Sequence, residues 1–223
     1  MVFRTFDIPG DELRNLEGDF EVSERNPFLG MRAITRDLRD VEVLRAEFEA
    51  VRNLLDAGYS NLELKFPFLR DLDEYRMAVS VLEEVGVEAH RDLRVGASVE
   101  TPSIALQVDE LLAEGVDFVS LGMSDLTMCS LVADRRSTRV AGIFDLSHPA
   151  VLKLVRGVVD ACHGAGVEVY AAGYAATSYM LVGRLIEMGV DGISTSPDKI
   201  LKMKSFAARV ERSLILRSLS RNI

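Results

Sequence analysis

The chain has 223 residues, of which 48% are hydrophobic and 27% charged, an ordinary composition for a globular protein with a sizeable core. Its net charge of −9 and the lack of a long run of Lys and Arg argue against nucleic-acid binding. Two cysteines are too few for a disulfide framework, and no apolar run approaches the roughly 18 residues that span a bilayer. We therefore expect one domain over residues 1–223, located in the cytoplasm, with neither a membrane nor a nucleic-acid partner.

Short apolar runs along the chain predict six β-strands. In chain order they are Val2–Ile8, Leu62–Phe66, Val95–Glu100, Phe118–Gly122, Val167–Ala172 and Gly192–Ser196. The stretches between them are amphipathic, as in the stripe of Leu44, Phe48 and Val51, and predict helices. Pro149 predicts the first turn of one more helix, and the last helix is expected from about Asp198 to Leu219.

A short phrase of glycine, valine and an acidic residue recurs where a predicted helix gives way to a strand. It occurs at Gly86-Val87-Glu88, Gly115-Val116-Asp117, Gly166-Val167-Glu168 and Gly189-Val190-Asp191. Glycine can take the left-handed conformation that ends a helix. Repeated helix, glycine and strand predict a parallel sheet with helical crossovers. Six strands fit either a doubly wound sheet or a TIM-type barrel that lacks two of its eight strands.

Two acidic residues stand where ligands bind in such folds, beyond the carboxyl ends of the strands. Glu100 ends one predicted strand and Asp125 follows the next. Neighbouring strands lie about 4.8 Å apart, so the two carboxylates can converge. Such oxygen donors, with room for water, suit Mg²⁺ or Mn²⁺. Acidic residues at strand ends also serve as helix caps, and that alternative stays open here.

The connection after the first strand contains a candidate anion-binding arginine. Arg32 follows Gly30 in the segment Asn26–Arg32. An arginine presented by such a loop can bind phosphate or carboxylate with two parallel hydrogen bonds. A surface salt bridge is the alternative.

Several motifs occur in the order known from one family. They are Asn-Pro-Phe-Leu-Gly-Met-Arg (26–32), Val-Glu-Thr-Pro-Ser (99–103), Ser-Leu-Gly-Met-Ser-Asp-Leu-Thr (120–127), Ala-Asp-Arg (133–135), His-Pro-Ala-Val (148–151) and Ser-Pro-Asp (196–198). In these motifs the chain resembles the C-terminal barrel domain of phosphoenolpyruvate (PEP)-utilising enzymes, namely PEP synthase, pyruvate phosphate dikinase and enzyme I of the sugar phosphotransferase system. The resemblance implies an α/β fold, a TIM-type barrel with about six strands that lacks the first two of the family barrel.

The resemblance also implies a binding site for PEP or pyruvate. It implies that Glu100 and Asp125 ligate Mg²⁺, and that Arg32 and Arg135 hold the phosphoryl group. Ser124 stands where the family has an asparagine and is expected to bind substrate over a shorter reach. The physical sense is that a divalent ion polarises substrate oxygens while arginines neutralise phosphoryl charge.

The chain departs from the family at the proton-transfer residue. The family's catalytic cysteine falls on Ala172, whose methyl group cannot act as a general acid. Tyr174 is a candidate replacement, although a phenol has an unperturbed pKa near 10. Lys65 is a catalytic candidate of another kind, because it shares a strand face with Glu63, where some members carry an arginine, and could restore the positive charge. A salt bridge between Lys65 and Glu63 is the alternative.

Two classes of function fit these residues. The first is an enzyme, a stand-alone barrel for PEP or a small 2-oxo acid that works with a separate phosphohistidine or nucleotide-binding subunit. A variant is a metal-dependent 2-oxo acid lyase, which needs no cysteine. The second class is a catalytically degenerate barrel that binds a metabolite or a partner. Exposed strands at the two ends of an incomplete barrel invite association, so we also expect a homo-oligomer or a covering terminal helix.

Overall fold

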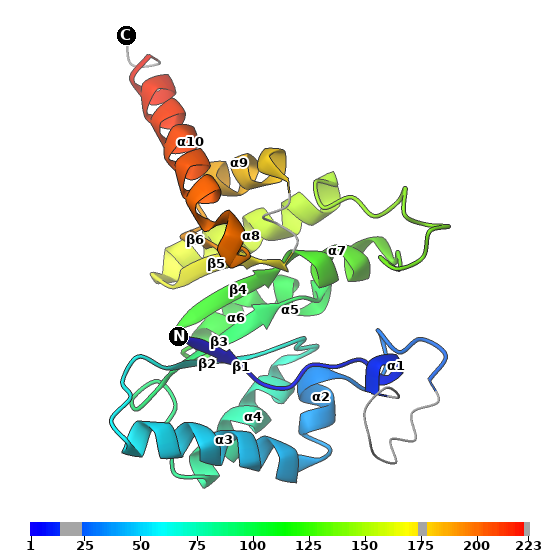
Figure 1. The fold of residues 1–223 in the computed structure, drawn as a ribbon, viewed down its shortest axis with the longest axis vertical. Helices are drawn as coiled ribbons and strands as arrows, with labels where there is room; N and C mark the ends of the chain where they lie inside the picture. Colours follow the sequence, from blue (N-terminus) through cyan, green and yellow to red (C-terminus); the bar gives the residue numbers. More distant parts are fainter. Residues whose placement is uncertain (14–23, 174–177, 221–223) are drawn as a thin grey trace. The chain divides into compact units, whose positions relative to one another are not determined.

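The computed structural model describes residues 1–13, 24–173 and 178–220. Six strands alternate with helices along the chain (Figure 1). The strands are β1 (Val2–Arg4), β2 (Glu63–Phe66), β3 (Arg94–Val99), β4 (Phe118–Gly122), β5 (Glu168–Ala172) and β6 (Gly192–Ile193). All six predicted strands are therefore confirmed, and the first and last are shorter than the apolar pattern indicated.

The helices begin and end at the residues that helix chemistry favours. They are α1 (Gly10–Leu13), α2 (Ala33–Asp37), α3 (Val41–Asp56), α4 (Leu72–Glu84), α5 (Pro102–Leu106), α6 (Val108–Ala113), α7 (Met123–Leu131), α8 (Pro149–Ala165), α9 (Tyr179–Met188) and α10 (Ile200–Ser220), the last preceded by a 3₁₀ turn, η2 (Pro197–Lys199). His148 Nδ1 accepts a hydrogen bond from Ala150 N at 3.2 Å and caps α8, with Pro149 in the first turn as predicted. Gly166 and Gly189 end α8 and α9 with φ of 71° and 94°, the left-handed conformation expected of them.

The strand order decides between the two folds that the sequence left open. The six-stranded sheet has the order β1-β2-β3-β4-β5-β6, and β1–β2, β2–β3 and β5–β6 pair in parallel. A doubly wound sheet reverses its strand order at a switch point, whereas a TIM-type barrel keeps the order of the sequence. The fold is therefore α/β with barrel-type topology and six strands, consistent with an incomplete TIM-type barrel.

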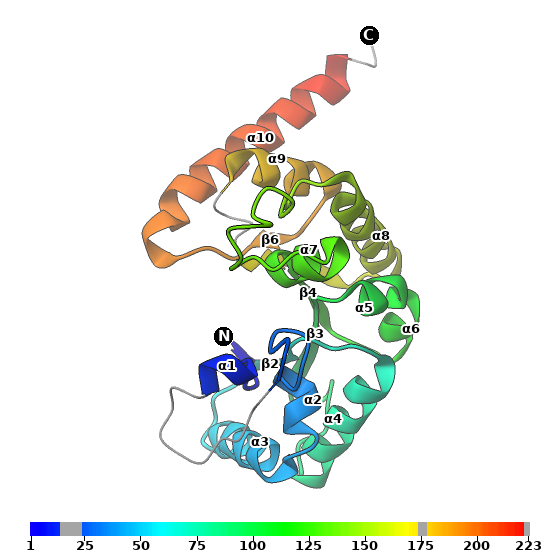
Figure 2. The ribbon, with the colours of Figure 1, turned by 90° about the vertical axis from the view of Figure 1, so that its right-hand side faces the viewer.

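The first of two compact units comprises Met1–Val99 and Glu110–Phe118. It contains β1 to β3, and α3 runs beside α4 in both ribbon views (Figures 1 and 2). Its core includes an aromatic cluster in which the Phe66 ring lies 6.1 Å from Phe48 and 5.6 Å from Tyr75, centroid to centroid. All three rings are buried, so α3 and α4 are held on β2 by apolar burial.

The second unit comprises Glu100–Asp109 and Val119–Ile223. In it α10 packs against α9 and β6 through Met203, Val182 and Ile193. The ring of Phe206 adds a contact with Tyr179, at 4.8 Å between centroids. The C-terminal half of α10 extends beyond α9 (Figures 1 and 2). Over the described part of the chain, every helix is too short or too polar to cross a membrane.

Candidate functional site

Glu100 lies directly after β3, and its side chain rests on the end of β4. A Cβ atom built on Gly122 would lie 2.3 Å from both Cγ and Oε1 of Glu100, closer than any real Cβ contact. Only glycine at position 122 leaves room for this carboxylate, which is buried. The packing therefore places Glu100 against Gly122, the N-cap residue of α7, three positions before Asp125.

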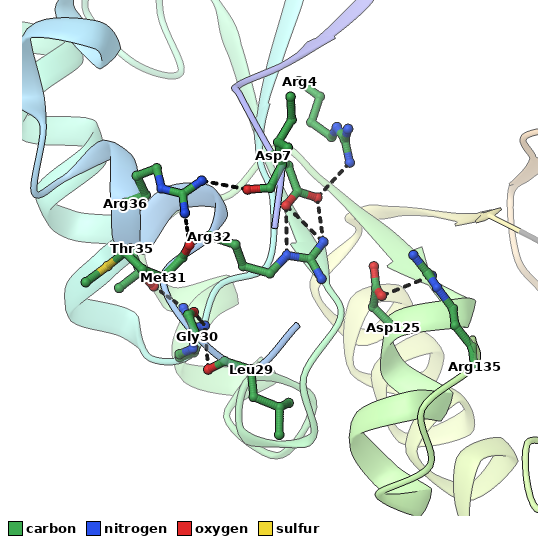
Figure 3. Close-up of polar contacts among 12 residues, drawn as sticks. Arg4, Asp7, Leu29, Gly30, Met31, Arg32, Thr35, Arg36, Asp125 and Arg135 are labelled. Atoms are coloured by element: carbon green, nitrogen blue, oxygen red, sulfur yellow. Dashed lines mark hydrogen bonds and ion pairs between the residues drawn. The ribbon is translucent and has the colours of Figure 1, made fainter. Parts of the chain in front are cut away.

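Asp125 lies in the first turn of α7, where the helix dipole favours negative charge. Its carboxylate forms an ion pair with Arg135, with Nη1 3.1 Å from Oδ1 (Figure 3). The side chain of Asp125 is 11% exposed and that of Arg135 is 24% exposed. The sequence had assigned these residues to a metal and to a phosphoryl group respectively, and the structure brings them into contact with each other.

The loop that presents Arg135 is ordered by its own backbone. Val132 ends α7 in a left-handed conformation, with φ of 51°. Asp134 Oδ1 then accepts a hydrogen bond from Arg136 N at 2.8 Å, and Asp134 O accepts one from Ser137 N at 3.1 Å. This turn fixes the backbone around Arg135, so the guanidinium reaches Asp125 from a defined position.

The donors present fit a hard divalent cation. Glu100 and Asp125 supply carboxylate oxygens, which Mg²⁺ and Mn²⁺ prefer. Within the described ranges, no group of three or more His, Cys, Asp or Glu could hold a metal ion. A cation between two carboxylates would keep several positions for water and substrate, as is usual for Mg²⁺. The guanidinium of Arg135 already shows that the Asp125 carboxylate attracts positive charge.

The neighbouring strand end supplies Ser124 and the position of the missing cysteine. A Cβ atom on Gly173 would lie 3.1 Å from Ser124 Oγ, so the end of β5 lies close to the start of α7. Ser124 is buried, and Ala172, at the last position of β5, is half-buried. Tyr174 lies outside the described residues.

Arg32 belongs to the first unit, where it forms a buried pair with Asp7 (Figure 3). Arg32 Nε donates to Asp7 Oδ1 and Nη2 donates to Asp7 Oδ2, each at 2.9 Å. Their side chains are only 3% and 2% exposed. Arg4 Nη1 also donates to Asp7 Oδ2, at 3.0 Å, from an exposed position. Arg32 thus makes two parallel hydrogen bonds to a carboxylate of the chain itself, in a buried salt bridge, and its contact with a phosphoryl group stays a prediction.

Aromatic rings and a second arginine hold the Arg32 loop in place. The Arg32 guanidinium carbon lies 4.1 Å from the centroid of the Phe68 ring, and the guanidinium carbon of Arg70 lies 5.1 Å from the same centroid. Arg70 Nη2 donates to Gly30 O at 2.6 Å, and Arg70 Nη1 donates to Thr35 Oγ1. Arg32 is therefore fixed by charge, stacking and loop contacts together.

Two further carboxylates, the buried Asp37 and the half-buried Glu47, lie near this pair. Burial, followed by the negative charges of Glu47 and Asp7, raises the pKa of Asp37 to about 8. A hydrogen bond from Thr5 and the charge of Arg36 act in the opposite direction. Burial also raises the pKa of Glu47, whose Oε2 accepts a hydrogen bond from Phe6 N at 3.4 Å. The cluster around Asp7 is therefore sensitive to pH near neutrality.

Glu63 is engaged by a residue of the next strand. Arg94 Nη1 on β3 lies 2.6 Å from Glu63 Oε1 on β2. Lys65 is half-buried and lies two positions along the same strand, on the face that Glu63 shares. Its proposed part in catalysis stays a prediction.

Sequence reasoning missed Asp7, Phe68 and Arg70 as parts of the Arg32 cluster. Asp7 is 25 positions from Arg32 and Phe68 is 36 positions away, so no local spacing links them. Asp7 lies inside the predicted strand Val2–Ile8, and the one signal it offered was a charged residue near the carboxyl end of that apolar run.

The chain is an α/β protein of barrel topology. Its second unit brings two carboxylates, an arginine and a serine to the ends of strands. A profile of the family described as PEP-utilising enzyme, PEP-binding domain, matches residues 1–212. The chain belongs to this family, as the ordered motifs predicted.

Two relatives show how far the likeness extends. Phosphoenolpyruvate synthase from Pyrococcus furiosus is 39% identical over 213 residues, which cover 95% of this chain and 26% of that protein. Phosphoenolpyruvate-protein phosphotransferase from Priestia megaterium is 38% identical over 213 residues, which cover 92% of this chain and 36% of that protein. The chain thus spans about a quarter to about a third of the length of these relatives.

Solved structures share the fold at low identity. A citrate lyase from Burkholderia xenovorans matches with a TM-score of 0.54 and 16% identity, over 89% of this chain and 62% of that one. RipC from Yersinia pestis matches with a TM-score of 0.52 and 13% identity, over 75% of this chain and 70% of that one. At such identities the likeness concerns the fold alone.

Proposed function

We propose that this chain is the PEP- or pyruvate-binding part of a phosphotransferase of the PEP synthase kind, with Mg²⁺ or Mn²⁺ held by Glu100 and Asp125. The observation that carries the proposal is the packing of the Glu100 carboxylate on Gly122, beside an Asp125 that is paired with a guanidinium. The 39% identity to a phosphoenolpyruvate synthase supports the substrate class. A soluble metabolite of this kind favours the cytoplasm as the location.

Each residue of the second unit has a role in this proposal. The bound cation would polarise the oxygens of the oxo acid. Arg135 would neutralise charge on the phosphoryl group, and the Ser124 hydroxyl would donate a hydrogen bond to a substrate oxygen. Arg32 stays the predicted phosphoryl contact of the first unit, held in a fixed orientation by Asp7.

A separate phosphohistidine or nucleotide-binding subunit is proposed as the phosphoryl donor. The three histidines of the chain each have a structural partner. His148 caps α8, His90 Nδ1 lies 2.8 Å from Asp117 Oδ2, and His163 Nε2 lies 3.6 Å from Asp191 Oδ2. These contacts give each imidazole a structural role, and the phosphoryl carrier is assigned to the partner subunit.

Ala172 favours a second candidate, a 2-oxo acid lyase or a binding protein without catalysis. A methyl group at the end of β5 can neither donate nor remove a proton. PEP chemistry therefore requires Tyr174 or water to supply the proton at the methylene carbon of the enolate. Exchange of the pyruvate methyl protons into D₂O, followed by NMR with Mg²⁺ present, separates these cases. Cation-dependent exchange supports an enzyme that forms the enolate, whether phosphotransferase or lyase, and binding without exchange supports the binding protein.

The metal site is tested by thermal unfolding with Mg²⁺ and oxalate, a mimic of enolpyruvate. A ligand that binds only the folded state at 100 times its Kd adds about 2.7 kcal/mol of stability. Glu100→Gln and Asp125→Asn are expected to abolish this gain, whereas Asp109→Asn, which removes an exposed charge of the same unit, retains it. No stabilisation of the wild type at millimolar ligand would remove the proposal.

A steric variant tests the same site without changing its charge. Gly122→Ala places a Cβ atom against Glu100, so the carboxylate must move and Mn²⁺ binding should weaken at least tenfold, about 1.4 kcal/mol. Gly157→Ala in α8 is the matched control, because its Cβ atom meets nothing within 4 Å. Equal Mn²⁺ affinity in the wild type and Gly122→Ala would show that Glu100 is not a ligand.

A further inference from the structure

The contact between Arg135 and Asp125 joins two residues that the proposed function assigns to opposite charges. Asp125 Oδ1 is 3.1 Å from Arg135 Nη1 and is also an oxygen that a divalent cation would use. A divalent cation on this carboxylate and a guanidinium 3.1 Å from it would repel each other, so each weakens the hold of Asp125 on the other. The cation and Arg135 therefore compete for Asp125.

Arg135 is placed so that it can leave Asp125 at small cost. Its side chain is 24% exposed, and the turn at Asp134 fixes the backbone rather than the guanidinium. Asp125 is the buried partner and Arg135 the more exposed one, so water compensates part of the guanidinium charge while the long side chain rotates to another acceptor. A nearby phosphoryl or carboxylate group of a bound ligand is such an acceptor.

We propose that Arg135 couples cation binding to anion binding by exchanging between two partners. Without a cation, Arg135 pairs with Asp125 and is withheld from the ligand. When a divalent cation occupies Asp125, Arg135 is released and binds the anionic group of the substrate. The inference rests on the proposed function, because it needs a cation at Asp125. It makes Arg135 a positioning residue for ordered binding, with the cation before the anion.

The exchange has an uncommon consequence for the Arg135→Gln variant. Without its competitor, Asp125 should bind Mn²⁺ in the absence of any anion about tenfold more tightly than the wild type does, which equals about 1.4 kcal/mol. The same variant should bind inorganic phosphate more weakly when Mn²⁺ is present. Positive coupling between the two ligands must be reciprocal, so the enhancement of phosphate binding by Mn²⁺ should fall by a similar factor.

The experiment measures free Mn²⁺ by electron paramagnetic resonance during titration of the full chain. Arg139→Gln is the matched control, since it removes one positive charge from the same loop at an exposed position. A change in long-range electrostatics alone would affect both variants equally, whereas the exchange affects Arg135→Gln about tenfold and Arg139→Gln less than about twofold.

The outcomes separate the inference from the function on which it rests. If the wild type binds no Mn²⁺, the proposed metal site itself is wrong. If the wild type binds Mn²⁺ and Arg135→Gln binds it equally or more weakly, only the exchange is overturned. NMR of the arginine Nε–H groups in the wild type gives a measurement that needs no variant. The Arg135 signal, assigned by backbone connectivity, must shift on addition of Mg²⁺. An unchanged signal at saturating Mg²⁺ overturns the inference.

Discussion

The two units each hold an arginine on a carboxylate, and they hold it in different ways. In the first unit, Arg32 makes two hydrogen bonds of 2.9 Å to Asp7 and stacks on Phe68. In the second unit, Arg135 makes an ion pair of 3.1 Å with Asp125 and remains partly exposed. Figure 3 shows the two hydrogen bonds from Arg32 to Asp7 and the single ion-pair contact from Arg135 to Asp125. The same two residue types thus form a fixed anchor in one unit and an exchangeable pair in the other.

Burial is the physical cause of this difference. A buried guanidinium cannot regain water when its partner leaves, so its pairing is enforced by the cost of an uncompensated charge. A partly exposed guanidinium loses little free energy when it changes partner, because water and counter-ions compensate part of its charge. Each unit therefore holds its own arginine, one fixed by burial and one able to respond to a ligand.

The largest effect expected is that of Asp7→Asn on the stability of the first unit. The substitution leaves the Arg32 charge buried without its counter-charge, which typically costs about 3–5 kcal/mol. Arg4→Gln is the matched control, because it removes the exposed partner of the same carboxylate and should cost less than about 1 kcal/mol. Urea unfolding of the three proteins measures the difference. A loss below about 1 kcal/mol for Asp7→Asn would show that the Arg32 pair is no firmer than an exposed one.

A smaller effect is expected from the buried acid Asp37, which lies beside the same pair. Its pKa is about 8 in the folded chain, against 3.8 for the free group, so the folded state binds more protons between these values. Stability should therefore fall as pH rises through this window, by about 1.4 kcal/mol per pH unit from this one group. From pH 6 to pH 8 the loss is about 2–3 kcal/mol. The stability is complete below about pH 4 and no longer changes with the ionisation of Asp37 above its folded pKa.

Asp37→Asn isolates that contribution, because the amide does not titrate. Free energies of unfolding measured at pH 6, 7 and 8 should decline more steeply in the wild type than in the variant. Parallel pH profiles would mean that Asp37 is ionised in the folded protein, and that the cluster around Asp7 tolerates three negative carboxylates.

The parts of the fold that the sequence could predict are those with a local signal. The six strands and the helix stops at Gly166 and Gly189 follow from apolar periodicity and from a left-handed backbone, and both depend on neighbours within a few residues. The first strand ends at Arg4 instead of Ile8. The apolar pattern could not show that Asp7, inside the predicted strand, turns its carboxylate to Arg32.

The candidate site was predictable in its residues and less so in its contacts. The motifs identified Glu100, Asp125 and Arg135, and strand order explains why the first two approach one region. The ion pair between Asp125 and Arg135 bridges ten positions and depends on a left-handed residue, Val132, that no sequence rule assigns. Pairings that depend on such turns, or on distant partners, require the folded structure.

The smallest effect expected concerns the exposed pair of Glu63 and Arg94, which provides the baseline for the comparison. Their side chains are 24% and 43% exposed, although the atoms are 2.6 Å apart. A double-mutant cycle with Glu63→Gln and Arg94→Gln should give a coupling below about 1 kcal/mol that decreases further in high salt. The pair belongs to the same unit as Arg32 and Asp7. A weak coupling between Glu63 and Arg94 and a strong one between Asp7 and Arg32 would assign the difference to burial. A Glu63–Arg94 coupling above about 2 kcal/mol would instead show that a short distance is enough for a strong ion pair, and the contrast between Arg32 and Arg135 would then need another cause.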